Sequence, residues 1–371
     1  MIRGIAAAAV LTGHIRGLFF VDYPAVVTKN SFTSAVYALT GLGHQSVMIF
    51  FVLSGFFIGG TVVSALSRWT WKKYLVNRMT RLYLVLLPAL ALTAVLDYFA
   101  HRGASGAIYF DRPIPNFAPV PLAANHGVLV WLGNSLFLQT IAVPVFGSNM
   151  PLWSLANEFW YYLLFPCFAI AAAAQFTFAK RLTAGLGGAA LIVFLPAGML
   201  WGFTVWMLGV GVFLAPERNA PKPVRLLLRV FASALLAAAL IWSRSHTSDA
   251  VRNDELVGLA FAAWLYCLLK VGGPRKDIPS GYQWLAKTIS GCSYSVYAVH
   301  LPIVMLLRCE LGGTRFQPTP MNLAIWTLVS VAVFLTGLLF SRLTEARTDV
   351  VRRKVMAATT SSALRNQPVK V

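Results

Sequence analysis

The chain has 371 residues, of which 58% are hydrophobic and only 12% are charged, and its mean hydropathy is +0.68. Soluble domains carry about 25% charged residues, so this composition excludes an ordinary soluble protein. The formal net charge is +19, but the basic residues lie in short loops between apolar runs. That arrangement is typical of membrane topology, and it argues against a nucleic-acid-binding protein.

Ten apolar runs follow one another along the chain, and runs of about 20 residues are what membrane-spanning helices require. The sequence therefore predicts an all-α, polytopic membrane helix bundle with about ten transmembrane helices. The expected spans are residues 2–20, 42–66, 82–100, 152–174, 184–200, 202–215, 226–242, 256–269, 289–307 and 323–340.

A long segment, residues 101–150, separates the third and fourth spans. Its second half, "GVLVWLGNSLFLQTIAVPVFG", is apolar but is interrupted by Gly133, Asn134 and Pro144. Broken backbone at membrane depth is tolerated only where protein or a cavity covers it. We therefore expect a re-entrant or surface-lying element, with an eleventh crossing as the alternative.

The distribution of basic residues predicts the orientation of the chain. With the amino terminus inside, 23 of the 31 lysine and arginine residues fall in cytoplasmic segments and eight fall outside. Cytoplasmic loops are enriched in these residues, so both termini are predicted to be cytoplasmic. Residues 1–345 form the predicted transmembrane domain. Residues 346–371 form a cytoplasmic tail that we predict to be disordered, because it becomes small and polar after Lys354.

The first span contains two ionisable residues, Arg3 and His14, in an otherwise apolar or small stretch. Eleven residues make about three helical turns, so both side chains face one side, roughly 16 Å apart along the axis. We expect Arg3 at the cytoplasmic edge and His14 in the outer half of the span, facing the bundle interior. They could be a topology charge and a packed histidine. They also fit a long substrate with an anionic head that enters from the cytosol and delivers its reactive end to His14.

The second span and the loop after it add three candidates. Ser54 lies among glycines and phenylalanines in "GHQSVMIFFVLSGFFIGG", where it could line a substrate or allow close helix packing. Arg78 and Arg81 lie in the basic, aromatic segment "SRWTWKKYLVNRMTRLYL". Residues three apart are neighbours on a helix, and two planar guanidinium groups could grip one phosphate. The alternative is an interfacial helix that only signals topology.

The block "MPLWSLANEFWYYLLFP" places Glu158 inside an aromatic span. A carboxylate at this depth needs a partner or a function. Glu158 could orient an imidazole, as an aspartate does in a catalytic triad, or form a structural ion pair. Trp153 and Tyr161 could form the wall of a sugar pocket, although aromatic belts at the membrane interface are commoner.

The late span "ISGCSYSVYAVHLPIVMLLR" is unusually polar, and Tyr297 and His300 are its candidates for contact with substrate. It has no G-x-S-x-G turn, so the indication of a hydrolase is weak. After the last span, Glu345 and Arg347 are interpreted as an interfacial pair. The four cysteines show no metal-ligand spacing, and we expect no metal site.

Five of these blocks occur in the order and in the spans found in one family. They are Arg3 with His14 eleven residues later, "FFVLSGF" at residues 50–56, Arg78 with Arg81, "WSL" followed by Glu158, and Ser293–Ser295 with Tyr297, His300 and Pro302. The chain resembles acyltransferase family 3, the membrane-bound bacterial O-acyltransferases of surface glycans, from Arg3 to about Glu345.

The resemblance implies an O-acyltransferase, in particular an O-acetyltransferase, in the bacterial inner membrane. The donor would be cytosolic acyl-CoA, such as acetyl-CoA, used as a co-substrate with no bound cofactor. The acceptor would be a carbohydrate or lipid-linked glycan; lipids would surround the protein, and no nucleic acid is involved. His14 would be a general base or acyl carrier supported by Glu158. The expected acyl-CoA-binding residues are Arg3, Arg78 and Arg81, and the expected substrate-lining residues are Ser54, Trp153, Tyr161, Tyr297 and His300.

Two other functions fit part of the sequence. A secondary transporter of a small anionic solute would also bury His, Glu and Arg, but it should show an internal repeat with matching interrupted helices, and the sequence shows neither. A non-enzymatic scaffold or sensor would not need Arg3 and His14 on one face together with an arginine pair.

Overall fold

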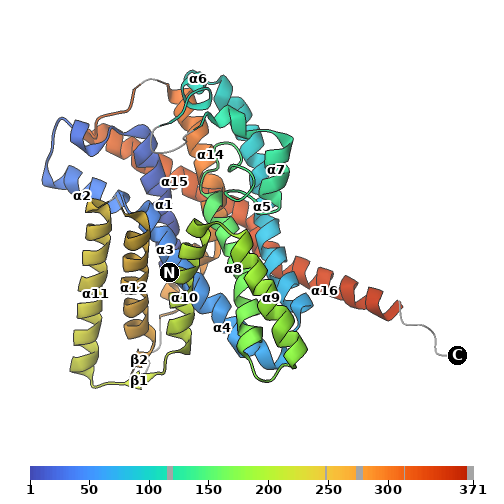
Figure 1. Cartoon of the computed structure of the whole chain (residues 1–371). Helices are drawn as coiled ribbons and strands as arrows, with labels where there is room; N and C mark the ends of the chain where they lie inside the picture. The colour runs from blue at the N-terminus through green and yellow to red at the C-terminus, as the bar shows by residue number, and fades with distance from the viewer. Residues whose placement is uncertain (115–119, 247–248, 273–278, 313, 366–371) are drawn as a thin grey trace.

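The computed structural model describes residues 1–371 except 115–119, 247–248, 273–278, 313 and 366–371, and it leaves out the side chains of 359–365. The chain forms a helical bundle (Figure 1). Its longer helices are α1 (Ile2–Phe19), α3 (Gly43–Ser54), α5 (Trp71–Arg102), α8 (Leu152–Ala172), α9 (Phe178–Phe194), α10 (Ala197–Leu214), α11 (Lys222–Ser245), α12 (Ala250–Leu269), α14 (Ser293–Leu311), α15 (Pro320–Leu343) and α16 (Thr348–Arg365).

Shorter elements connect these helices. The short α-helices are α2 (Ser31–Thr40), α4 (Gly60–Ala65), α6 (Gly106–Phe110), α7 (Val128–Ser135) and α13 (Ser280–Gly291). The single turns are η1 (Tyr23–Ala25), the π-helical η2 (Gly55–Gly59), η3 (Leu66–Arg68), η4 (Leu122–Asn125) and η5 (Glu345–Arg347). Two parallel two-residue strands, β1 (Arg218–Asn219) and β2 (Val271–Gly272), join two loops at one end of the bundle.

Seven helical segments of the described residues are long and apolar enough to cross a membrane. They are Ser31–Arg68, Trp71–Arg102, Leu152–Ala172, Ala197–Leu214, Lys222–Ser245, Ser293–Leu311 and Pro320–Ala358. The other three expected spans are helices α1, α9 and α12, with 18, 17 and 20 residues. They are not among the seven segments that are long and apolar enough to cross a membrane. The all-α membrane bundle is therefore confirmed, whereas the count of ten and the cytoplasmic termini stay predictions.

One expected boundary is wrong. The break expected between residues 200 and 202 lies at Leu195 and Pro196, where Leu195 is extended (φ −83°, ψ 138°) because a residue before proline avoids the helical region. The tail expected to be disordered is instead helical from Thr348 to Arg365, and α16 packs against α5. Packing of this kind supports helices that propensity alone does not. Residues 366–371 of the expected tail lie outside the described residues.

The segment before α8 is a broken element, as its glycine and proline predict. Helix α7 has only eight residues, too few for an eleventh crossing, and the backbone after it has positive φ at Phe137 and Thr140. Protein covers it: Asn134 and Gln139 are fully buried, and their amides bind the carbonyl oxygens of Pro144 and Leu152.

A buried carboxylate holds the end of this element. Asp97 of α5 accepts hydrogen bonds from the backbone N–H of Ser148 (2.8 Å) and from Nε2 of His126 (2.9 Å). Burial lowers the pKa of His126, but the hydrogen bond and charge of Asp97 outweigh it, so the pKa is raised. Asn149 donates to the carbonyl oxygen of Ala298 in α14 (2.8 Å), which fixes α8 relative to α14 at the level of the site.

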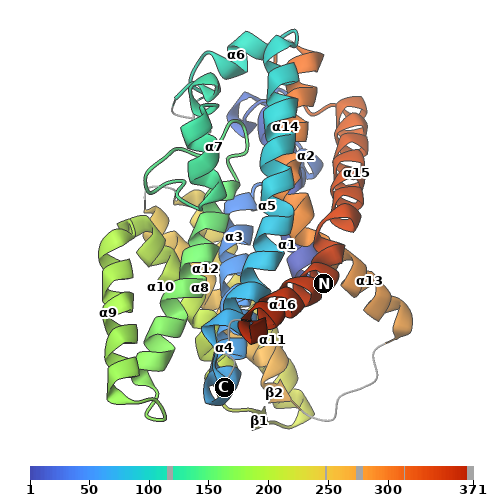
Figure 2. The ribbon, with the colours of Figure 1, turned by 90° about the vertical axis from the view of Figure 1, so that its right-hand side faces the viewer.

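Helix α1 lies in the centre of the bundle and packs against α3 and α14. Helices α9 and α11 are peripheral and pack mainly on α8 and α12 (Figures 1 and 2). The amino-terminal end of α1 lies about half-way along the bundle in both views, because α1 is much shorter than the 32-residue α5. Arg3, expected at an edge, therefore lies well inside the molecule.

Candidate active site

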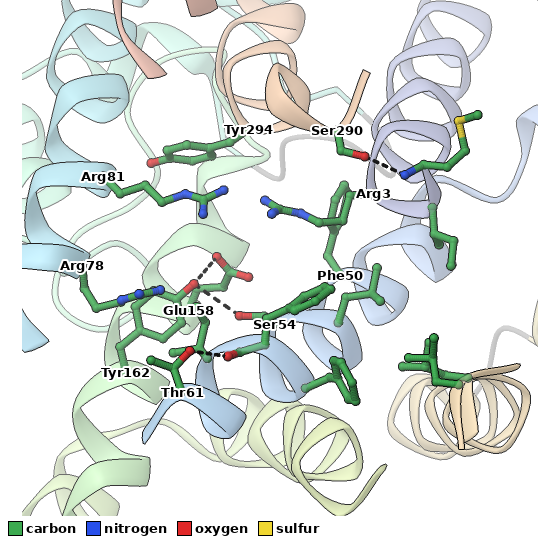
Figure 3. Close-up of a pocket in the computed structure, with 18 of the residues that line it drawn as sticks. Arg3, Phe50, Ser54, Thr61, Arg78, Arg81, Glu158, Tyr162, Ser290 and Tyr294 are labelled. Atoms are coloured by element: carbon green, nitrogen blue, oxygen red, sulfur yellow. Dashed lines mark hydrogen bonds between the residues drawn. The ribbon is translucent and has the colours of Figure 1, made fainter. Parts of the chain in front are cut away.

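A cavity of about 640 Å³ opens at the amino-terminal end of α1, and we call it the wide cavity. Helices α1, α3, α4, α5, α8, α12, α13 and α14 and the turn η2 contribute to its wall. Arg3 comes from α1, and Arg78 and Arg81 come from neighbouring turns of α5. Figure 3 shows Arg3 and Arg81 pointing toward one another across the cavity, with Arg78 beside Glu158. The three residues expected to bind the donor thus line one cavity.

The three arginines are unequally paired. Arg81 forms an ion pair with Glu345 (Nη2 to Oε1, 3.5 Å). Nε of Arg78 is buried and has no hydrogen-bond partner in the described part of the chain. Across the described residues, Arg3 has no hydrogen bond or ion pair within bonding distance. Positive charge therefore exceeds negative charge at this wall, as an anion-binding site requires.

Glu158 lines the same cavity, and among the described residues no hydrogen bond joins it to His14. Its carboxylate accepts a hydrogen bond from Oη of Tyr162 (3.0 Å). Oη of Tyr162 is also 3.2 Å from Oγ of Ser54, so Ser54, Tyr162 and Glu158 form a hydrogen-bonded row along the wall. The physical reason is distance along the bundle: Glu158 lies at the level of Arg3, about three helical turns from His14.

A second cavity of about 50 Å³ continues from the first, and we call it the narrow cavity. The two cavities share Arg3, Phe50, Glu158 and Tyr294. At its far end Oγ of Ser154 lies 2.7 Å from Oη of Tyr297, and both hydroxyl groups face the carbonyl oxygen of Pro151. Tyr297 was expected to contact substrate, and it lines this cavity.

His14 lies beyond Tyr297, paired with a second histidine. Nδ1 of His14 is 2.8 Å from Nε2 of His300, and the rings stack with centroids 5.1 Å apart. The ring of Tyr297 contacts His300 (5.9 Å). His300 is fully buried and His14 is half-buried, and neither is among the residues that line the two cavities.

The hydrogen bonds of the pair assign its tautomers. Nδ1 of His300 faces the carbonyl oxygens of Tyr297 (2.8 Å) and Val296 (3.2 Å), so it carries the proton and donates. Nε2 of a neutral His300 is then an acceptor, and Nδ1 of His14 donates to it. Nε2 of His14 is left unprotonated, and no hydrogen bond engages it among the described residues. The arrangement provides one base with a free lone pair.

Two expected lining residues are not among those that line the two cavities. Tyr161 is fully buried, and its hydroxyl donates to the carbonyl oxygen of Met199 (2.6 Å), outside both cavities. Trp153 stacks on His44 and contacts the edge of Phe51. Both residues serve the aromatic core between α3, α8 and α10, because α8 is apolar around most of its circumference.

Sequence reasoning missed two relationships. It placed His300 in the substrate wall, whereas His300 is the partner of His14. It paired Glu345 with Arg347, whereas Glu345 accepts from Ser295 (3.1 Å) and pairs with Arg81. The polar residues "SYS" before His300 were the available signal, since Ser295 anchors Glu345.

Comparison with known proteins agrees with this geometry. The family model of acyltransferase family 3, described as an acyltransferase domain, matches residues 1–342. No curated protein and no solved structure matches the chain. Since the family model covers nearly the whole chain, and several helices are long and apolar enough to cross a membrane, the chain belongs to acyltransferase family 3 and is a multi-pass membrane acyltransferase that transfers groups other than aminoacyl groups.

Proposed function

We propose that the protein is an O-acyltransferase of the bacterial inner membrane. It moves an acyl group, most simply acetyl, from cytosolic acyl-CoA to a hydroxyl group of an extracytoplasmic or membrane-associated glycan. The supporting observation is the order in which the two cavities and the histidine pair follow one another along the bundle. A wide cavity with three arginines leads to a narrow cavity, which ends at Tyr297 beside the His14–His300 pair.

The wide cavity suits the charged part of coenzyme A. Guanidinium groups bind phosphate oxygens with two parallel N–H donors, and Arg3, Arg78 and Arg81 present such groups from two sides. The apolar part of the wall, which includes Leu265, Leu268 and Leu269 of α12, suits the pantetheine arm. The arm is then long enough to carry the thioester into the narrow cavity.

His14 acts as the general base. Its Nε2 takes the proton from the acceptor hydroxyl as the oxygen attacks the thioester carbonyl carbon. The C–S bond then breaks, the proton passes to the departing sulfur, and coenzyme A leaves as the thiol while the acceptor keeps the new ester. His300 keeps the proton on Nδ1 of His14, so it is a positioning residue. If one of the Ser154 and Tyr297 hydroxyls turns away from the Pro151 carbonyl, it can donate to the thioester carbonyl oxygen as negative charge develops.

The test separates donor binding from chemistry. In purified protein, Arg78→Ala with Arg81→Ala should weaken acetyl-CoA binding at least tenfold, because two charge-assisted contacts are lost. The matched control is Lys73→Ala, an exposed cation of the same helix outside both cavities, which should bind as the wild type does.

His14→Gln should bind acetyl-CoA normally and hydrolyse or transfer its acyl group about 10²–10⁴-fold more slowly, the usual cost of losing a general base. Activity within a few-fold of wild type, normalised to folded protein, would show that His14 is structural. Wild-type protein that binds no acyl-CoA would overturn the donor assignment.

A further inference from the structure

The two cavities differ more than tenfold in volume, about 640 Å³ against about 50 Å³. A cavity needs about 10–15 Å³ of volume for each water-sized group that it holds. The narrow cavity therefore has room for roughly four non-hydrogen atoms. An acetyl group has three. A chain of six carbons does not fit unless the wall moves.

Most of that wall is fixed by the core. Val47, Phe51 and Leu155 are each at most 5% exposed and belong to the main hydrophobic cluster. Phe51 is held by edge contacts with Trp153 (6.1 Å) and Tyr161 (5.6 Å). Ser154 and Tyr297 hold one another and the carbonyl of Pro151. Moving any of these side chains disturbs helix packing as well as the cavity.

Phe50 differs from these neighbours. Among the described phenylalanine, leucine and valine residues of the narrow cavity, it is the one that is only half-buried. It lines both cavities, so its ring stands where one opens into the other. Its edge contacts the ring of Tyr297 (5.9 Å), which in turn contacts His300.

We propose, resting on the function above, that Phe50 sets the upper length of the acyl group that the enzyme accepts. The acyl group of the thioester occupies the narrow cavity, and the ring of Phe50 closes the side through which a longer chain could extend back into the wide cavity. Each excess methylene in an apolar pocket changes the specificity constant by about 10–200-fold. Phe50 is therefore a specificity-determining residue and takes no part in proton transfer.

The experiment compares acetyl-CoA with hexanoyl-CoA in thioester hydrolysis by the purified protein. In this reaction water takes the place of the acceptor, the C–S bond breaks, and coenzyme A and the carboxylic acid are released. Wild type should hydrolyse hexanoyl-CoA with a kcat/KM at least tenfold below that for acetyl-CoA. Phe50→Ala should raise the hexanoyl-to-acetyl ratio at least tenfold, and Phe50→Leu should raise it less. The matched comparison is Phe178→Ala, since Phe178 of α9 is 76% exposed and is not among the residues that line the two cavities; its ratio should stay at the wild-type value.

Each outcome has one meaning. Equal rates for both thioesters in wild type, or an unchanged ratio in Phe50→Ala, would overturn the role of Phe50. Where hydrolysis is too slow to follow, competition for binding gives the ratio of the dissociation constants of hexanoyl-CoA and acetyl-CoA, and Phe50→Ala should shift this ratio in favour of hexanoyl-CoA. Failure of wild type to bind either thioester would instead overturn the proposed donor, and the inference with it. If Phe50→Ala does not fold, the hexanoyl-to-acetyl ratio of Phe50→Leu is the test, and an unchanged ratio in that variant would overturn the role of Phe50.

Discussion

The two histidines come from opposite ends of the chain, 286 residues apart. Helical spacing placed Arg3 and His14 on one face, but spacing within one span contains no information about which other span supplies a partner. The depth of His14 in its span predicts that it needs a hydrogen-bonding partner. Glu158 was the expected partner because carboxylates commonly orient a catalytic imidazole. The structure provides an imidazole instead, which fixes the tautomer of His14 without placing a negative charge beside it.

If His300 fixes the tautomer of His14, two variants of His300 should lower the reaction rate by different amounts. In His300→Gln the amide oxygen can still accept from Nδ1 of His14, so the rate should fall less than about tenfold. His300→Phe keeps a ring of similar shape but has no acceptor, so His14 can take the wrong tautomer and the rate should fall about 10²–10³-fold, approaching the loss of the base itself. The measurement is acetyl-CoA hydrolysis per folded molecule, with acetyl-CoA affinity as the control. Equal losses in both variants would assign His300 to packing alone.

At the scale of elements, the wide cavity depends on close contact between α10 and the α3–η2 segment. The turn η2 is π-helical, a distortion common at functional sites, and it exposes Phe57 to the cavity. Trp206 and Val210 of α10 pack where Gly55 and Gly59 leave room. From the sequence, these small residues could serve helix packing or contact substrate; in the structure the glycines serve packing and Ser54 lines the cavity.

Two glycines of α10 test this contact. A Cβ on Gly209 would overlap the carbonyl oxygen of Val52 and the backbone nitrogen of Phe56, whereas a Cβ on Gly211 would meet nothing within 4 Å. Gly209→Ala should therefore destabilise the protein by about 1–3 kcal/mol, as overpacking does. Gly211→Ala should be neutral or stabilise it by up to about 1 kcal/mol through helix propensity. Thermal unfolding in detergent compares the two, and equal midpoints would contradict close contact at Gly209.

Helix existence was predictable from the sequence because apolar runs and loop charges are strong local signals. The boundary between α9 and α10 was misplaced because both helices are apolar across it, and Pro196 was the better guide. The arginines of the cavity were predictable as residue types that bind phosphate. The location of the cavity was not, because it depends on how far α1 reaches relative to α5, and no local pattern encodes that relationship.

At the scale of the whole molecule, the number of membrane crossings can be measured. Helices α1, α9 and α12 are not among the seven segments long and apolar enough to cross a membrane. Ten crossings with a cytoplasmic amino terminus predict a definite pattern of reporter fusions in the loops. Fusions after Lys29 and Arg112 should report the outside, and fusions after Thr70 and Ala220 should report the cytosol. A cytosolic signal after Arg112 or an outside signal after Ala220 would contradict the ten-span arrangement.

The half-way position of the amino-terminal end of α1 has an electrical consequence. If coenzyme A binds there, its phosphates stay with the arginines on the cytosolic side, and the group that passes Phe50 and Tyr297 is an uncharged acyl group. No net charge then crosses the remaining part of the membrane, so the reaction neither draws on the membrane potential nor opposes it. Under the proposed function, the ring contacts from Phe50 through Tyr297 to the histidine pair line the way that this uncharged group takes.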